Sequence, residues 1–378
     1  MRAHRLPILL ACLAAGLAAQ KKAEFEGRPA LVIENDRLEL TILTDGGAMA
    51  RLILKDDPER LNPMWEPARL ARELGQPSRF GAGTGHFVCV DGFGGVSKEE
   101  QAAGLQGHGE AHRQPFEVIE AGAGAATLRA TLPIVQEVLT RSHRLVAGEN
   151  VVYVEGELES LLGFDRPVVW AEHATIGAPF LAPEVTVVDL SAGPSQTRPT
   201  PEGQRFRRRL ASGKDFTWPM APAKSGELVN VRAAPANPDL LDHTTTLLDP
   251  NRETAFVTAL NLEKRLILGY LFRREEFPWL QIWEHYPQGR TLARGLEFST
   301  QPYDVPRRQA ISLGTMFGAP TYRWLPAKSK IGARFLLFYT RTPEGFRKVD
   351  DVRLEGSQLI IEDRHAGRRI VLAASRGL

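Results

Sequence analysis

The stretch from Trp279 to Arg307 combines aromatic side chains with carboxylates and amides over a short span. Aromatic rings can stack on the apolar faces of sugars, and carboxylate and amide oxygens accept hydrogen bonds from hydroxyl groups. The side chains of this stretch that could act in this way are those of Trp279, Trp283, Glu284, His285, Glu297, Gln301 and Tyr303. This composition predicts a cleft that binds a carbohydrate.

Glu297 is the residue in this stretch that could carry out chemistry. It lies between Leu296 and Phe298, and successive side chains of a strand point to opposite faces. Partial desolvation beside these apolar neighbours would raise the pKa of the Glu297 carboxyl group, as suits a base that works near neutral pH. We predict that Glu297 is a catalytic base.

Two histidines are predicted to lie opposite Glu297. His108 has a glycine on each side, and glycine lets backbone and ligand approach closely. His173 stands at the end of an apolar strand with an aromatic residue nearby. Imidazole is the side chain that exchanges a proton near neutral pH, so both are candidates for acid chemistry or hydrogen bonding.

Further residues are predicted to contact the substrate. They are His112, Arg113, Trp283, Glu284 and Gln301. The histidines at 86, 143, 285 and 365 are expected to be structural or exposed, and His243 stays outside the predicted site.

The sequence indicates neither a metal nor a cofactor. There is no H-E-x-x-H motif, and the pair His108 and His112 has no third ligand nearby in sequence. The glycine runs at 81–85 and 92–95 do not join a strand to a long helix, as a nucleotide-binding turn requires. We interpret both runs as loops near the site. A Ser-His-Asp hydrolase is disfavoured because no G-x-S-x-G turn occurs.

The bulk composition is that of an ordinary soluble globular protein. The chain has 378 residues, of which 24% are charged and 43% hydrophobic. Its net charge of +2 gives no reason to expect a nucleic acid as partner. The expected partner is a small sugar or the end of a glycan, and the oligomeric state stays open.

The N-terminus has the pattern of a cleavable secretory signal. A basic start is followed by an apolar run from Leu6 to Leu17 that is too short to span a bilayer, and then by small residues. We expect residues 1–19 to be removed, after Ala18 or Ala19, and the protein to be exported to the periplasm or the outside. Lipid anchoring at Cys12 is a minor alternative.

Removal of the signal would leave Cys89 as the single cysteine, without a disulfide. It lies in the apolar run Phe87-Val88-Cys89-Val90, so we interpret it as a small buried hydrophobic residue.

The rest of the chain reads as short strands separated by turns. Strands are predicted within 31–43, 50–54, 116–132, from Glu137 to Glu159, and within 254–272 and 334–341. One short helix is predicted over 67–74, and strands in the tail from Val352 are expected to close the sheets. This pattern favours an all-β sandwich or barrel, with residues 20–378 forming a single domain.

The order of several short motifs resembles the aldose 1-epimerase (galactose mutarotase-like) superfamily over roughly residues 31–346. The motifs are the Gly46-Gly47 turn, His108-Gly109, Pro167…His173…Pro179 and Gly295-Leu296-Glu297…Gln301-Pro302. The resemblance implies a large antiparallel β-sandwich, the galactose mutarotase-like supersandwich. It also implies a sugar cleft on a concave face and a core reaction that needs no metal.

The resemblance further implies a role for each of the three central residues. Glu297 would remove the proton of the anomeric hydroxyl, and His173 would protonate the ring oxygen as the ring opens. His108 would hydrogen-bond near the ring oxygen or a neighbouring hydroxyl. The free aldehyde would then rotate and close from the opposite face.

Three alternatives remain open at this point. The protein could bind carbohydrate without turnover. It could be a glycoside hydrolase or lyase, in which a second carboxylate such as Glu172 or Glu284 would face Glu297 at roughly 5–9.5 Å. It could also act on a phosphorylated sugar held by the basic residues from Arg205 to Arg209, although export disfavours such a substrate.

Overall fold

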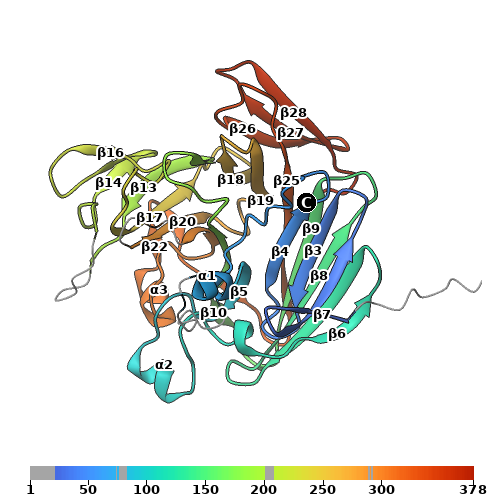
Figure 1. The fold of residues 1–378 in the computed structure, drawn as a ribbon. Helices are drawn as coiled ribbons and strands as arrows, with labels where there is room; N and C mark the ends of the chain where they lie inside the picture. The colour runs from blue at the N-terminus through green and yellow to red at the C-terminus, as the bar shows by residue number, and fades with distance from the viewer. Residues whose placement is uncertain (1–21, 74, 76–82, 201–207, 288–289, 291–292) are drawn as a thin grey trace, which may run out of the picture.

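The computed structural model describes residues 22–73, 75, 83–200, 208–287, 290 and 293–378. Two large antiparallel sheets dominate it, with a few short helices at the edges (Figure 1). The predicted all-β sandwich is therefore confirmed. The predicted signal segment, Cys12 and Arg205 to Arg207 lie outside the described residues.

The first sheet has 13 strands and carries the candidate site. In spatial order they are β1 (Lys22–Phe25), β2 (Arg28–Glu34), β3 (Leu38–Leu43), β4 (Met49–Leu54), β5 (His86–Val90), β11 (Trp170–Gly177), β21 (Ala293–Ser299), β20 (Trp279–Tyr286), β17 (Leu240–Leu248), β13 (Ala192–Thr197), β14 (Asp215–Thr217), β15 (Met220–Pro222) and β16 (Leu228–Asn230).

The second sheet has eight strands and packs against one face of the first. In spatial order they are β12 (Thr186–Leu190), β18 (Thr254–Asn261), β19 (Leu266–Arg273), β25 (Lys330–Arg341), β9 (Val151–Ser160), β8 (Glu137–Leu145), β7 (Ala125–Leu132) and β6 (Glu117–Ala121).

The main core fills the space between the two sheets. Every second side chain of a strand points to the same face, so each strand contributes alternate residues to this core. On β9, Val152, Val154 and Leu158 belong to this core, whereas Glu155 and Glu157 are exposed. The carboxylates of this strand therefore lie on a solvated face. The single long strand predicted from Glu137 is wrong: the chain turns at 146–150 and returns, so that β8 and β9 form an antiparallel pair.

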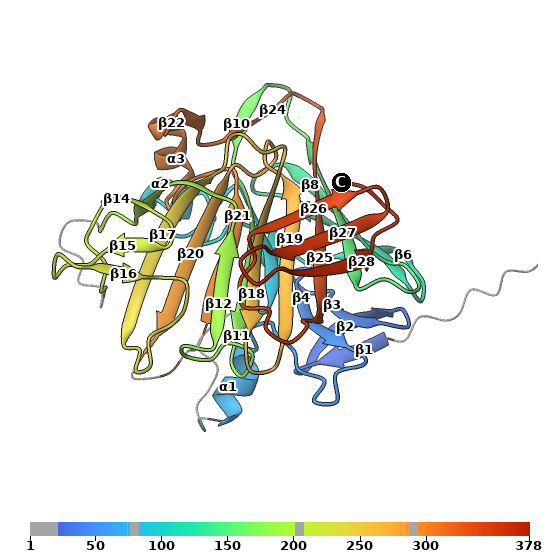
Figure 2. The same cartoon turned by 90° about the horizontal axis from the view of Figure 1, so that it is seen from above.

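The C-terminal tail does not close either large sheet, contrary to our prediction. Strands β26 (Asp351–Glu355), β27 (Gln358–Asp363) and β28 (Arg368–Ala373) pair only with each other, as a three-stranded sheet (Figure 2). Its inner side chains, among them Val352, Leu359 and Ile361, share a second apolar cluster with Phe256 and Phe338 of the eight-stranded sheet. The tail therefore shields the outer face of that sheet from water.

Short helices and ribbons occupy the loops. The helix expected over 67–74 is confirmed as α1 (Pro67–Glu73), whereas α2 (Lys98–Ala102), α3 (Arg307–Leu313) and the 3-10 turn η1 (Ala111–Arg113) were not predicted. A capping box of Ser97 and Glu100 starts α2. The two-stranded ribbons are β10 (Arg166–Val168) with β24 (Arg323–Leu325), and β22 (Thr315–Met316) with β23 (Ala319–Pro320). Among the described residues, no helix is long and apolar enough to cross a membrane.

Candidate functional site

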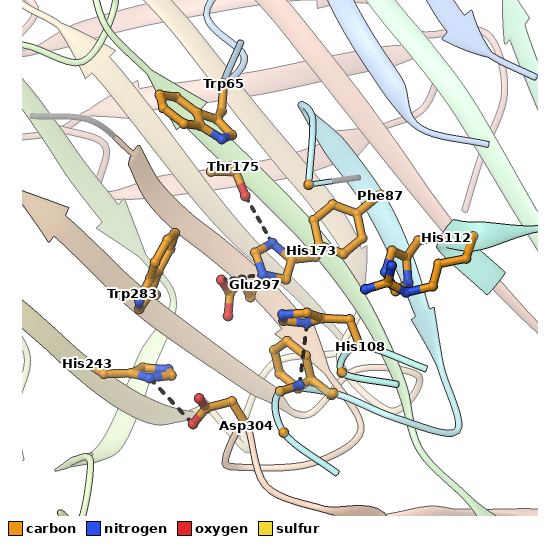
Figure 3. Close-up of a pocket in the computed structure, with 16 residues that line it drawn as sticks. Trp65, Phe87, His108, His112, His173, Thr175, His243, Trp283, Glu297 and Asp304 are labelled. Carbon is orange, nitrogen blue, oxygen red and sulfur yellow. Dashed lines mark hydrogen bonds and ion pairs between the residues drawn. The ribbon is translucent and has the colours of Figure 1, made fainter. Parts of the chain in front are cut away.

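A pocket of ≈ 640 Å³ lies over the face of the 13-stranded sheet that points away from the second sheet (Figure 3). This volume falls within the roughly 300–1,000 Å³ of small-molecule sites. The described lining residues include the predicted Glu297, His173, His108, His112, Arg113 and Trp283, together with Trp65, Gly83, Phe87, Phe93, Gly94, Gly95, Gly107, Thr175, His243 and Asp304. The structure thus brings the three predicted central residues together in one cavity.

The pairing register of β11 and β21 sets Glu297 beside His173. Ala171 pairs with Ser299 and Thr175 pairs with Gly295, so His173 and Glu297 lie level on the same face of neighbouring strands. His173 Nε2 lies 3.2 Å from Glu297 Oε1. The alternation predicted for Glu297 is confirmed, because Leu296 and Phe298 point into the core.

Gly295 makes this contact possible. A Cβ atom at this position would lie 2.2 Å from Glu297 Oε1, closer than any real contact allows. The Glu297 carboxylate therefore lies directly over the backbone of Gly295, where only a residue without a side chain leaves room, and from there it contacts His173.

Two neighbours fix the His173 ring. Its Nδ1 lies 2.9 Å from the hydroxyl oxygen of Thr175. The Phe87 ring stacks on it, with ring centroids 4.3 Å apart and planes at 20°. The imidazole is thus held in one orientation, with Nε2 aimed at the carboxylate.

Burial shifts the pKa values of the pair in opposite directions. Burial raises the pKa of Glu297 well above its ordinary value, and the charge of Asp304 adds to this increase. Burial lowers the pKa of His173 well below its ordinary value, and His108 contributes in the same direction. Both shifts disfavour the charged forms, so burial favours the pair as carboxylic acid and neutral imidazole. The state with carboxylic acid and neutral imidazole differs from the state with carboxylate and imidazolium by one proton moved across 3.2 Å.

His108 is presented by a tight loop around Gly94. The Gly94 N–H donates to His108 Nδ1 at 3.4 Å, and the Gly94 carbonyl accepts from the His108 backbone N–H at 2.9 Å. Because Nδ1 accepts, the proton of the neutral ring is on Nε2. Burial lowers the pKa of His108 to about 4, so the ring is neutral at pH 7 and can donate from Nε2.

Trp283 forms one wall of the pocket. Its ring lies 6.4 Å from that of His173 at 72°. His285, expected to be structural or exposed, stacks against Trp283 at 5.6 Å with nearly parallel planes. Trp283 thus offers a supported aromatic face, as the carbohydrate prediction requires.

Asp304 is an acidic residue of the pocket that was not predicted from the sequence. A Cβ atom on Gly94 would collide with the Asp304 backbone, so the two loops are in close contact. Arg198 Nε donates to Asp304 Oδ1 at 2.5 Å, and His243 Nδ1 lies 3.5 Å from the same oxygen. Burial opposes ionisation, but His243 and Arg198 keep the pKa of Asp304 below its ordinary value.

His243, also left out of the predicted site, lines the pocket beside Asp304. Burial lowers its pKa to about 4. His243 pairs directly with Trp283, and directly paired residues of neighbouring strands share a face, so a long-range pairing that the sequence does not reveal places His243 in the pocket.

Two predicted contact residues do not line the pocket. Glu284 is adjacent to Trp283 on β20 and so points to the opposite face, where it lies 3.5 Å from Arg209 and from Arg294. Gln301 is buried beneath the site, and its Nε2 donates to the carbonyl of Tyr303. It therefore supports the loop that carries Asp304.

Glu172, the other candidate for a second carboxylate, also points away from the pocket. It is buried between the sheets, where Arg141 donates to it at 2.6 and 3.0 Å and His86 Nε2 lies 2.8 Å away. The hydrolase alternative therefore loses both of its proposed partners for Glu297. His86 is structural, as predicted.

The remaining predictions concern residues outside the pocket lining. His143 is buried, His365 is exposed, and Cys89 is buried with its Sγ 3.7 Å from His108 Nδ1. In the described part of the basic patch, Arg209 is paired with Asp242 at 2.9 Å. No cluster of three or more His, Cys, Asp or Glu side chains that could hold a metal occurs among the described residues.

Several solved structures with a similar fold are described as galactose mutarotase-like or galactose mutarotase related proteins. The galactose mutarotase-like protein of Clostridium acetobutylicum has a TM-score of 0.58 at 14% identity, with 85% of this chain and 98% of that chain covered. The galactose mutarotase related enzyme of Lactobacillus acidophilus has a TM-score of 0.57 at 13% identity, with 84% of this chain and all of that chain covered.

A third similar structure is the galactose mutarotase-like protein of Lactobacillus casei, with a TM-score of 0.56 at 15% identity and 82% of this chain covered. It is covered along its whole length. No protein-family model and no curated protein matches the sequence. The structural similarity confirms the predicted galactose mutarotase-like sandwich.

Proposed function

We propose that this protein interconverts the anomers of a sugar by opening and reclosing its hemiacetal ring, as an aldose 1-epimerase does. The observation that carries the proposal is the 3.2 Å contact between His173 Nε2 and Glu297 Oε1 inside the pocket. Ring opening needs a base at one oxygen and an acid at another, and this pair offers both.

In the proposed reaction the pair starts as carboxylate and imidazolium. Glu297 takes the proton of the anomeric hydroxyl while the bond between C1 and the ring oxygen breaks. The bonding electrons go to the ring oxygen, which takes the proton of His173 Nε2. The pair is then carboxylic acid and neutral imidazole, which is the form that burial favours. After rotation of the aldehyde, the reverse transfers close the ring.

The other lining residues would orient the sugar. The neutral His108 ring can donate from Nε2 to an oxygen near the ring oxygen, and Trp283 can cover an apolar face of the sugar. Asp304 can accept from hydroxyl groups, because its carboxylate is ionised and lines the same cavity.

The test is to follow optical rotation after dissolving pure α-anomers of a panel of aldoses with and without the wild-type protein. The proposal expects at least one sugar to equilibrate faster than in buffer, in proportion to protein concentration. If none of the panel does so, the proposal is wrong.

A carbohydrate-binding protein without turnover is the second candidate. One observation favours it: burial raises the pKa of Glu297 well above its ordinary value, which disfavours the ionised form that a base requires. The two candidates differ in one measurable property. A binding protein would shift or broaden sugar resonances in NMR spectra without accelerating the interconversion of anomers.

The pH dependence of kcat/KM should show a broad plateau. The free enzyme works with one proton on the pair, and it gains a second only below the lowered pKa of His173. It loses this one proton only above the raised pKa of Glu297. Activity should therefore persist as the pH rises through 6.5, the ordinary histidine value. Rates corrected for buffer catalysis between pH 4 and 9 check this, and a fall centred near 6.5 would contradict it.

Gly295→Ala is expected to lower kcat/KM by about 10²-fold while the protein stays folded. The new methyl group would push the Glu297 carboxylate away from His173, and a misplacement of about 1 Å can have an effect of this size. Steady-state kinetics and thermal unfolding are the measurements. Gly163→Ala is the matched control, because a Cβ atom there would meet no atom within 4 Å. Equal activity of both variants would show that the carboxylate position does not matter.

We also propose that the protein acts outside the cytoplasm, on the strength of the signal-like residues 1–19. Intact-mass measurement of the protein purified from expressing cells is the test. Recovery of an uncleaved chain in the cytoplasmic fraction alone would rule export out.

A further inference from the structure

Arg113 is a charged group of the pocket that the proposed reaction does not use. It is exposed and lines the cavity next to His112, on the turn η1. In the part of the chain that the structure describes, its guanidinium has no hydrogen bond or ion pair. The nearest acid in sequence, Glu110, instead accepts from Gln114 and from the backbone N–H of Ile134.

The other charges of the described lining residues are compensated. Asp304 is paired with Arg198 at 2.5 Å, and Glu297 Oε1 lies 3.2 Å from His173 Nε2. The charge of Arg113 acts on the same space. Burial is the main cause of the lowered pKa values of His108 and His112, and the charge of Arg113 lowers both pKa values further. The pocket thus has an excess positive charge on its Arg113 side.

The position of Arg113 relative to the reacting pair indicates which part of a sugar would meet it. The Phe87 ring contacts the rings of His173, His108 and His112, at centroid distances of 4.3, 5.6 and 5.4 Å. His112, next to Arg113, therefore lies on the Phe87 side of the site. Trp283 and His243 lie on the opposite side of the His173–Glu297 pair (Figure 3).

In the proposed reaction His173 protonates the ring oxygen, so the ring oxygen faces the histidine cluster. The carbon beyond the ring oxygen carries the exocyclic group of a hexose. That group would then point toward His112 and Arg113, while the ring hydroxyls remote from the ring oxygen would point toward Asp304 and Trp283.

We propose that the substrate is an acidic sugar of the hexuronic acid class, whose exocyclic carboxylate is bound by Arg113. This inference rests on the proposed function for the orientation of the sugar. One guanidinium fits one carboxylate through two parallel hydrogen bonds. A doubly charged phosphate would call for a second cation, and Arg113 is the one uncompensated cation among the lining residues described.

The test compares kcat/KM for galacturonate and glucuronate with galactose, glucose and the hexose 6-phosphates. The wild type should prefer the uronates over the neutral sugars by about tenfold or more, the usual effect of a hydrogen bond to a charged group. Arg113→Gln should remove most of this preference, and Arg113→Lys should restore part of it. Arg129→Gln, an exposed arginine on β7 of the other sheet, is the matched control and should keep the preference.

Three outcomes would overturn the proposal: equal rates for uronates and neutral sugars, a preference that survives Arg113→Gln, or faster turnover of the 6-phosphates than of the uronates. A second readout separates this inference from the proposed function. Galacturonate and galactose are titrated into Glu297→Gln and into the double variant with Arg113→Gln. Tighter, salt-sensitive binding of galacturonate that depends on Arg113 would support the acidic-sugar site even if no turnover occurs.

Discussion

Replacing Glu297 by glutamine is expected to reduce the acceleration of anomer interconversion by ~10²–10⁴-fold, the usual contribution of a positioned acid–base group. The amide has nearly the same shape but cannot accept the anomeric proton. The effect should appear in kcat, because the base acts in the transition state and contributes little to binding. Initial rates by polarimetry at several protein concentrations give the ratio to the wild type.

Glu157→Gln is the matched control for this prediction. Glu157 lies on the solvated face of β9 and pairs with Lys330 at 2.7 Å. The Glu157→Gln variant should catalyse anomer interconversion at the wild-type rate within experimental error. If Glu297→Gln retained the wild-type rate, another residue would have to be the base.

Glu172→Gln is expected to lower the free energy of unfolding by about 3–5 kcal/mol, as is usual when one partner of a buried ion pair is removed. Glu172 lies on β11 of one sheet and Arg141 on β8 of the other, so their pair joins the two sheets directly behind His173. Trp170 Nε1 also donates to this carboxylate, at 3.1 Å. The variant would leave the Arg141 charge buried without its counter-ion. Urea unfolding followed by fluorescence measures the difference.

The same carboxylate makes stability depend on pH. Burial alone would raise the pKa of Glu172, but Arg141 and His86 hold it at about 2, below the ordinary 4.5. The stabilisation of the folded protein by ionised Glu172 is therefore fully present above pH 4.5 and is lost as the pH falls toward 2. The Glu172→Gln variant should lack this part of the acid sensitivity. Glu157→Gln, which breaks an exposed ion pair, should lower the free energy of unfolding by less than about 1 kcal/mol. If both variants lost the same free energy of unfolding, the buried Glu172–Arg141 pair would have no special role in stability.

The faces of individual strands could be predicted from sequence because side-chain alternation is local. The alternation around Glu297 indicated correctly that it would point away from the core. The same rule should have excluded Glu284 once Trp283 was placed in the pocket, because adjacent strand residues point to opposite faces. Residues that are adjacent in the sequence of a strand are therefore not neighbours on one face of the sheet.

Features that depend on long-range pairing could not be predicted. Asp304 lies in an irregular loop, and it reaches the pocket through Arg198 and the close packing against Gly94. Neither contact leaves a periodic signal in sequence. The tail from Val352 was recognised as strands, but its packing on the outer face of the second sheet depends on an apolar surface built from distant residues such as Phe256 and Phe338.

Catalysis of anomer interconversion is measured most directly as magnetisation exchange between the two anomers of an equilibrated sugar, observed by NMR at H1 with galacturonate and galactose. If the His173–Glu297 pair catalyses ring opening, exchange cross-peaks between the α and β signals are expected with the wild-type protein. These cross-peaks are expected to be lost with Glu297→Gln and to be absent in buffer on the same timescale. Absence of exchange with the wild type, despite line broadening that proves binding, would contradict catalysis by the His173–Glu297 pair.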